Sequence, residues 1–297
     1  MKSRIFITRI IYTFIIIAII AVFYFMVNKA LNPIKTIYSV SAVTEKAKCQ
    51  IKDIGGSSFN IYQAIVYDEN DKVVFKEFTG NFRFYNSAII ECERLSNGPF
   101  IVTIYNDSLG SVGGVYKDEN LVYKSKNRIV FVFTKLENLF NQGKSIVIPI
   151  SGKIESGEDV AGQVEGITSP ILREGTVTLA GYSKLSSSYF NAGTEQLFMG
   201  DRLIFENDTV SAIGFIQVSE EPAFKIAYRV EAEQAKILKP GPRDINSGYV
   251  FSATIYDQLL HDKVFQSISL VGALLALVAT LGSFLMDILK FRYKEHE

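Results

Sequence analysis

The sequence predicts a mainly β ectodomain of antiparallel sandwich or barrel units, held between two transmembrane α-helices. Three observations lead to this fold class. Two long apolar runs without charged residues lie toward the two ends of the 297-residue chain. Between them, short runs of β-branched and aromatic residues alternate with turn residues, which is the pattern of β-strands. The same region lacks the alternating strand and helix patterns that would indicate a parallel sheet.

The composition excludes several classes of protein. Apolar residues make up 48% of the chain, which excludes a disordered protein. Basic and acidic residues number 31 each, so no overall positive charge would attract nucleic acid, and we expect no nucleic-acid partner. With two Cys and two His, the sequence offers neither a dense disulfide framework nor a zinc site made of His and Cys. We predict no cofactor and no metal.

The first apolar run, Ile10 to Val27, predicts a transmembrane helix at 10–27 that follows a cytoplasmic N-terminus at 1–9. Its 18 residues include no charge, Gly or Pro, and as a helix they would cover about 27 Å, close to the hydrocarbon core of a bilayer. A cleaved signal peptide is the alternative. It would have a shorter apolar core followed by small residues, whereas Phe23 to Met26 occupy that place here. We therefore expect an uncleaved anchor.

The second apolar run, Ile268 to Met286, contains 19 uncharged residues and predicts a second transmembrane helix. A buried amphipathic helix would show polar residues in every turn, but this run shows only Ser and Thr. Apolar residues at helical spacing begin upstream at Ile255, and neither Gly nor Pro occurs from there to Gly272. We therefore predict one juxtamembrane and transmembrane helix over 252–289, followed by a cytoplasmic tail at 290–297.

Basic residues near the apolar runs predict the orientation in the membrane, because cytoplasmic flanks of transmembrane helices are enriched in Lys and Arg. The flanks toward the chain ends carry Lys2, Arg4, Arg9, Lys290, Arg292 and Lys294. The opposite flanks carry Lys29, Lys35 and Lys263. We expect a two-pass protein of the inner (plasma) membrane with both termini in the cytoplasm. Its main domain, within about residues 36–263, would be periplasmic or otherwise extracytoplasmic.

The region after Asn32-Pro33 predicts a first β-rich extracytoplasmic domain at 36–141. Turn residues such as Asp68 to Asp71 separate its runs, which is the spacing of an antiparallel sandwich or barrel. A short helix is expected at Leu136 to Asn141. The expected strands are Phe59–Tyr67, Val73–Phe78, Phe82–Cys92, Phe100–Tyr105, Leu121–Tyr123 and Arg128–Phe133.

The composition changes near residue 141, which predicts a second, Gly-rich β extracytoplasmic domain at 142–240. No aromatic residue occurs from Asn141 to Gly181, whereas Gly recurs there. The alternative is one continuous β domain with a Gly-rich middle. The expected strands are Ser145–Ile150, Val160–Val164, Gly175–Leu179, Leu203–Phe205, Val210–Val218 and Phe224–Glu231.

Residues suited to catalysis are scarce, so the sequence predicts a non-enzymatic protein. The two histidines, His261 and His296, lie outside the β region, where a nucleophile would need a base beside it. Neither a Gly-x-Ser-x-Gly motif nor a phosphate-binding Gly-rich loop with Lys occurs. A hydrolase that uses two carboxylates is an alternative, because the region contains many acids. The Asp68 to Asp71 cluster lacks the Gly and terminal Glu of a calcium loop, so we interpret it as a hairpin turn.

The two cysteines, Cys49 and Cys92, both fall in the first β domain. An isolated pair in an oxidising compartment often forms a disulfide, and we expect one here. Two buried free thiols are the alternative.

The second transmembrane run carries small residues along one broad stripe. Small side chains let helix backbones approach closely and pack in a membrane. We expect this face to pack against the first helix, another copy or another protein. The alternative is that Ala and Gly are simply common in membrane helices. The residues of the stripe are Ser269, Gly272, Ala273, Ala276, Ala279, Thr280 and Ser283.

Together these expectations favour a non-enzymatic two-pass membrane protein. Its β-rich domain would bind or scaffold within a homo-oligomer or an envelope complex, and its partners would be the lipid bilayer and a membrane or envelope protein. The first alternative is a membrane-acting effector or pore-type protein that oligomerises through its transmembrane helices. The second alternative is the carboxylate-dependent ectodomain hydrolase.

Overall fold

The computed structural model describes residues 34–51, 57–85, 88–106, 110–157, 171–183, 186–206, 211–240 and 248–294, together with Ile17, Ala21 and Tyr24. The chain divides into two compact units. The β unit comprises Lys35–Leu179 and Gly193–Ser252. The helical unit comprises Met1–Ile34, Ala180–Ala192 and Ala253–Glu297.

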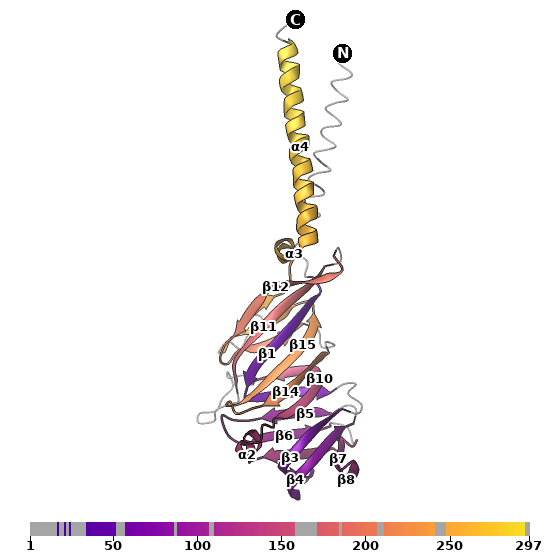
Figure 1. The fold of residues 1–297 in the computed structure, drawn as a ribbon, viewed down its shortest axis with the longest axis vertical. Coiled ribbons are helices and arrows are strands. Elements are labelled where there is room, and N and C mark those ends of the chain that lie inside the picture. Colours follow the sequence, from indigo (N-terminus) through magenta and orange to yellow (C-terminus); the bar gives the residue numbers. More distant parts are fainter. Residues whose placement is uncertain are drawn as a thin grey trace. The chain divides into compact units, whose positions relative to one another are not determined.

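Strands dominate the β unit, with one short helix, α2 (Leu136–Phe140), among them (Figure 1). The first strands are β1 (Thr36–Thr44), β2 (Lys46–Ile51), β3 (Ser58–Tyr67), β4 (Val73–Phe84), β5 (Ile89–Glu93), β6 (Phe100–Tyr105), β7 (Gly113–Lys117), β8 (Asn120–Lys124) and β9 (Arg128–Phe133). The later strands are β10 (Ile146–Ser156), β11 (Leu172–Ser183), β12 (Ser188–Leu197), β13 (Arg202–Phe205), β14 (Ala212–Val218), β15 (Phe224–Ala232), β16 (Ala235–Leu238) and β17 (Tyr249–Phe251).

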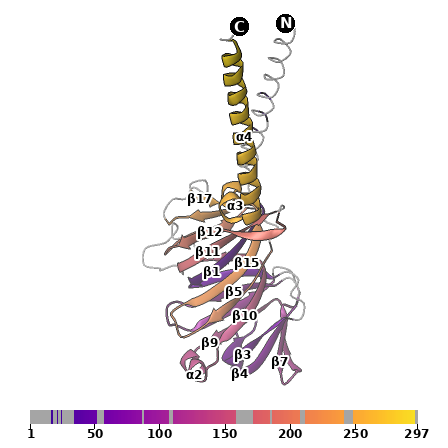
Figure 2. The same ribbon diagram turned by 45° about the horizontal axis from the view of Figure 1, so that its top comes forward.

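The strands form one large sheet and one small sheet (Figures 1 and 2). The order in the large sheet is β12-β11-β1-β15-β14-β10-β2-β5-β6-β9-β3-β4-β7-β8, and in the small sheet it is β13-β16-β17. Neighbouring strands with a defined register run antiparallel. The prediction of a mainly β, antiparallel fold is therefore confirmed for the described residues.

Alternate side chains of the large sheet build the core. In β1, Tyr38, Val40 and Ala42 are buried, while the residues between them are half-buried or exposed, because successive side chains of a strand point to opposite faces. The sheet also folds back on itself, since β3 packs against β10 although the two strands are not neighbours in the sheet.

Aromatic rings fill the space enclosed by this fold. Phe59, Phe82 and Phe131 meet with ring centroids 5.3–5.8 Å apart, a range typical of edge-to-face and tilted packing. The small sheet packs through Phe205 on Tyr38 of β1, with centroids 5.4 Å apart. The Tyr38 hydroxyl donates to the backbone carbonyl of residue 251 at 3.1 Å, and burial raises the pKa of Tyr38 to about 12.

The domain boundary predicted near residue 141 is not a break in the sheet. The short helix expected there is present as α2, and β10 follows it. β10 then pairs with β2 from the first predicted domain and with β14 from the second. Residues on both sides of the boundary therefore belong to one β unit, which corresponds to the alternative of one continuous domain.

Individual strand predictions had mixed outcomes. β6 and β9 begin and end at the predicted residues. The prediction of a single strand over Phe82–Cys92 was wrong, because β4 ends at Phe84 and β5 begins at Ile89. The predicted strand Val160–Val164 lies outside the described residues.

The helical unit contains α3 (Ile255–His261) and α4 (Lys263–Lys294). The prediction of one unbroken helix over 252–289 was wrong, because the helix is interrupted at Asp262. Within the described residues, one helix is long and apolar enough to cross a membrane, at Lys263–Phe284. Most of the first apolar run at 10–27 lies outside the described residues, although Ile17, Ala21 and Tyr24 are helical. The first transmembrane helix therefore stays a prediction.

Candidate functional site

The corner between α3 and α4 is a compact polar junction inside the helical unit. α3 begins with a capping box: the Asp257 carboxylate accepts from the backbone N–H of Thr254 at 2.8 Å, and the Thr254 hydroxyl accepts from the backbone N–H of Asp257 at 3.2 Å. This motif satisfies N–H groups that the first turn of a helix leaves unpaired. It fixes where α3 starts.

Asp262 sits at the corner itself and caps α4. One carboxylate oxygen, Oδ1, accepts from the backbone N–H groups of Val264 at 3.0 Å and Phe265 at 3.3 Å. The other, Oδ2, accepts from the hydroxyl of Ser186 at 3.1 Å and the amide of Gln258 at 3.4 Å. Asp262 is only 5% exposed. Each oxygen of this buried carboxylate therefore has hydrogen-bond donors.

These hydrogen bonds control the charge of Asp262. Burial alone would raise the pKa of its carboxyl, because it disfavours the charged form. Donors from Ser183, the backbone of Phe265, Ser186 and Gln258 together outweigh burial and hold the pKa below its usual value. Asp262 is therefore ionised at neutral pH, which suits a residue at the positive end of the α4 dipole.

The junction draws three chain segments of the helical unit together. The Gln258 amide also donates to the hydroxyl of Ser183 at 2.8 Å, which ties α3 to the hairpin between β11 and β12. The backbone N–H of Ile34, next to the first apolar run in sequence, donates to the carbonyl of Ala253 at 3.1 Å. The chain before the β unit and the chain after it therefore meet at one place.

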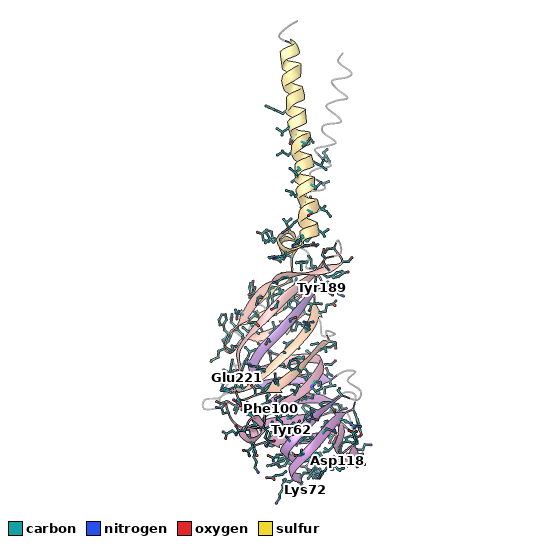
Figure 3. All side chains as sticks on the ribbon, viewed as in Figure 1. Tyr62, Lys72, Phe100, Asp118, Tyr189 and Glu221 are labelled. Atoms are coloured by element: carbon teal, nitrogen blue, oxygen red, sulfur yellow. The ribbon has the colours of Figure 1, made fainter. Side chains whose placement is uncertain are left out.

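The predicted small-residue stripe lies on α4. Its residues from Gly272 to Ser283 are exposed, and Ser269 is half-exposed. The hydroxyl of Thr280 donates to the carbonyl of Ala276 at 2.8 Å, and that of Ser283 donates to the carbonyl of Thr280 at 2.8 Å. The polar groups are thus satisfied within the helix. No described residue of another segment lies within 4 Å of the position that a Cβ on Gly272 would take. Figure 3 shows side chains projecting outward from the part of α4 nearer to α3.

The two cysteines are free thiols in the structure, so the expected disulfide is not confirmed. Cys49 on β2 pairs with Ile90 of β5, and Cys92 of β5 pairs with Ala47. The cysteines are therefore diagonal neighbours, for which Cα atoms lie roughly 7–8 Å apart. That separation is too long for a disulfide without movement of the backbone. Burial raises the pKa of both thiols, so the structure favours the alternative of two buried free thiols.

An apolar strip interrupts the outer face of the large sheet. We define the strip as Val147 and Pro149 on β10 with Ile213 and Phe215 on β14. Pro149 lies directly opposite Phe215 in the ladder, so the four residues are contiguous. Ile213 is 72% exposed, Val147 44% and Phe215 42%. Single exposed apolar side chains are ordinary, but contiguous ones indicate contact surfaces.

A basic residue lies at one edge of the strip. Arg229 of β15 lies opposite Ile213 and is exposed, and no ion pair of Arg229 is found among the described residues. Further along the same sheet, β2 and β5 carry the ion pair of Lys46 with Glu91, 2.8 Å apart. The strip is thus an apolar area beside an exposed cation.

The predicted hairpin at Asp68 to Asp71 has the geometry of a turn. The Asp68 carboxylate accepts from the backbone N–H groups of Asn70 at 2.9 Å and Lys72 at 2.8 Å. The backbone hydrogen bond from Lys72 is the main cause that lowers the pKa of Asp68. Among the residues that the structure describes, no group of three or more His, Cys, Asp or Glu side chains could hold a metal ion. His261 lies exposed on α3.

Sequence reasoning missed the junction and the strip. Asp262 interrupts a helical pattern without Gly or Pro, and an Asp there is a possible N-cap, which is the one local signal that could have been used. The strip depends on which face of β10 and β14 is covered, and the sequence of a strand does not show that. No protein-family model and no curated protein sequence matches the chain.

Proposed function

We propose that the chain is a non-enzymatic, two-pass membrane protein whose β unit lies outside the cytoplasm and binds a partner protein. The apolar run of α4 anchors the chain at one end, and the run at 10–27 anchors it at the other. The hydrogen bond between Ile34 and Ala253 supports this arrangement, because it joins the chain segments that follow the first anchor and precede the second.

One observation carries the proposal of a partner, namely the exposed apolar strip of Val147, Pro149, Ile213 and Phe215. Burying apolar surface is the main favourable term in protein association, at about 25 cal/mol per Å². Arg229 at the edge of the strip would pair with a carboxylate of the partner, which adds specificity. The partner therefore presents an apolar surface with an acidic side chain at its edge.

The stripe on α4 gives the protein a second contact surface, within the membrane. Two helices gain no hydrophobic energy from meeting in lipid, so close backbone packing has to supply the attraction. Gly272, Ala276 and Thr280 recur one turn apart and would allow it. We propose that copies of α4 associate through this stripe, so that several β units present their strips together.

Site-specific photo-crosslinking in intact cells tests the partner proposal. A photoreactive amino acid is placed at Ile213 or Phe215 in the full-length chain, and at Gln50 as a control. Gln50 is exposed on β2 of the same sheet but outside the strip. We expect one discrete adduct from the strip positions and none from Gln50, and Arg229→Glu should reduce its yield. Equal adducts from all three positions, or none from any, would contradict the proposal.

A further inference from the structure

A cavity of about 130 Å³ lies inside the β unit, where the small sheet meets the large one. Its wall includes Leu203 and Phe205 of β13 and Ala212, Tyr228 and Val230 of β14 and β15. The rings of Phe205 and Tyr228 meet edge-on, with centroids 6.3 Å apart. This side of the cavity is therefore apolar.

The cavity exists because neighbouring strands end at different points. Among the described residues, β14 pairs with β10 as far as Ala212 opposite Gly152. On the other side, β2 pairs with β10 from Gly152 to Ser156. Residues of β10 beyond Gly152 thus extend past the end of β14, and β13 crosses at this place without pairing with β10 in the sheets. The register of the strands therefore leaves this gap.

Charged residues also belong to the lining of the cavity, beside this apolar wall. Arg202, Lys153 and Glu155 all belong to its lining. Lys153 and Glu155 form an ion pair with a separation of 3.8 Å, whereas no ion pair of Arg202 is found among the described residues. Arg202 therefore offers a planar guanidinium that can donate two parallel hydrogen bonds to a carboxylate or phosphate.

We propose that this cavity binds a small amphiphilic anion, with its short aliphatic chain against Leu203, Phe205 and Val230 and its carboxylate or phosphate at Arg202. Ligand pockets usually measure about 300–1,000 Å³. A cavity of about 130 Å³ therefore holds only a short chain or the end of a longer one. The site is separate from the strip and from α4, so the proposal does not depend on the proposed function.

Ligand-observed saturation-transfer NMR tests the proposal on the full-length protein in phosphatidylcholine nanodiscs, with empty nanodiscs as the blank. The probes are hexanoate, hexanol and hexylammonium, which share a chain length and differ in charge. Dihexanoyl phosphatidate, tested beside hexanoate, distinguishes a lipid source of the anion from a free acid. We expect hexanoate or the phosphatidate to bind at least tenfold more tightly than hexanol and hexylammonium.

Two variants test the two parts of the site. Arg202→Gln should weaken binding of the anion about tenfold and leave binding of hexanol unchanged. Arg128→Gln, which removes an Arg that pairs with Asp71 and is not in the lining of the cavity, should change neither. Ala212→Val narrows the cavity and should weaken the anion and hexanol alike, with thermal unfolding as the check that the variant folds. Equal binding of the three hexyl probes, an anion affinity that Arg202→Gln leaves unchanged, or a cavity that takes up only water would overturn the proposal.

Discussion

At the residue scale, Asp262 connects separate parts of the helical unit. It caps α4 through two backbone N–H groups and holds the β11–β12 hairpin through Ser186, which lies 76 residues away in the chain. Its substitution would leave several buried donors without an acceptor. Unsatisfied buried donors cost more than the hydrogen bond itself contributes.

Asp262→Ala should therefore lower the local free energy of unfolding of the helical unit by about 2 kcal/mol. Amide hydrogen exchange of the full chain in nanodiscs measures this, and protection should fall in residues 186–192 and 255–266. Asp262→Asn is the matched comparison, because its carbonyl oxygen can still cap α4 while its amide group meets the donors of Ser186 and Gln258. Its effect should be intermediate. Unchanged exchange in Asp262→Ala would show that the carboxylate is not structurally required.

The same carboxylate predicts a pH dependence. The pKa of Asp262 is lower in the folded protein than its usual value near 3.9. The ionised carboxylate therefore contributes its stability fully above about pH 4 and loses it as the pH falls through the folded pKa. After correction for intrinsic exchange rates, the difference in protection between wild type and Asp262→Asn should shrink below pH 4. A difference that grows on acidification would contradict the assigned charge.

The cysteines give a third prediction at this scale. Cys49 and Cys92 are fully buried, and burial raises the pKa of both thiols, which removes the reactive thiolate. Iodoacetamide should leave the folded protein unmodified and should modify both thiols after denaturation without a reductant. Intact-mass measurement distinguishes the two states. A protein that needs reduction before it gains two alkyl groups would carry the disulfide after all.

At the element scale, strands with strong local signals were predictable and strands with weak ones were not. β6 and β9 are dense in β-branched and aromatic residues and are bounded by turn residues, so both were predicted to the residue. β1 was not predicted, because Ser39 and Ser41 alternate with its core residues and weaken the apolar pattern. The sequence between β4 and β5 contains Asn86 and Ser87, which are residue types that favour turns, and the prediction of a single strand did not use this local signal.

The stripe on α4 makes a prediction at the same scale. Gly272→Leu and Ala276→Leu add bulk to the exposed stripe while keeping the helix apolar enough to insert. Cross-linked oligomers should fall by roughly tenfold, which corresponds to about 1.4 kcal/mol. Leu270→Ala, Leu274→Ala and Leu281→Ala, away from the stripe, are the controls and should leave the oligomers intact. If the stripe variants assemble like the wild type, α4 is an anchor and any assembly comes from the β unit.

At the scale of the whole molecule, the features that matter are long-range pairings. β1 pairs with β15, so Thr44 lies opposite Phe224. A local sequence pattern does not predict which distant strand a given strand pairs with. The cavity and the strip both follow from where β10 meets β2 and β14, which is why sequence reasoning found neither. The overall class, mainly β with an apolar helix near the C-terminal end, was predictable because it depends on composition and periodicity alone.

The central claim is that the β unit lies outside the cytoplasm while both termini lie inside. Labelling with a membrane-impermeant maleimide tests it directly, because the native cysteines are buried. Lys72→Cys places a thiol at an exposed turn of the β unit (Figure 3), and Glu297→Cys places one at the last residue. In intact spheroplasts, position 72 should be labelled and position 297 should stay unlabelled until the membrane is permeabilised. Labelling at position 297 with protection at position 72 would contradict it.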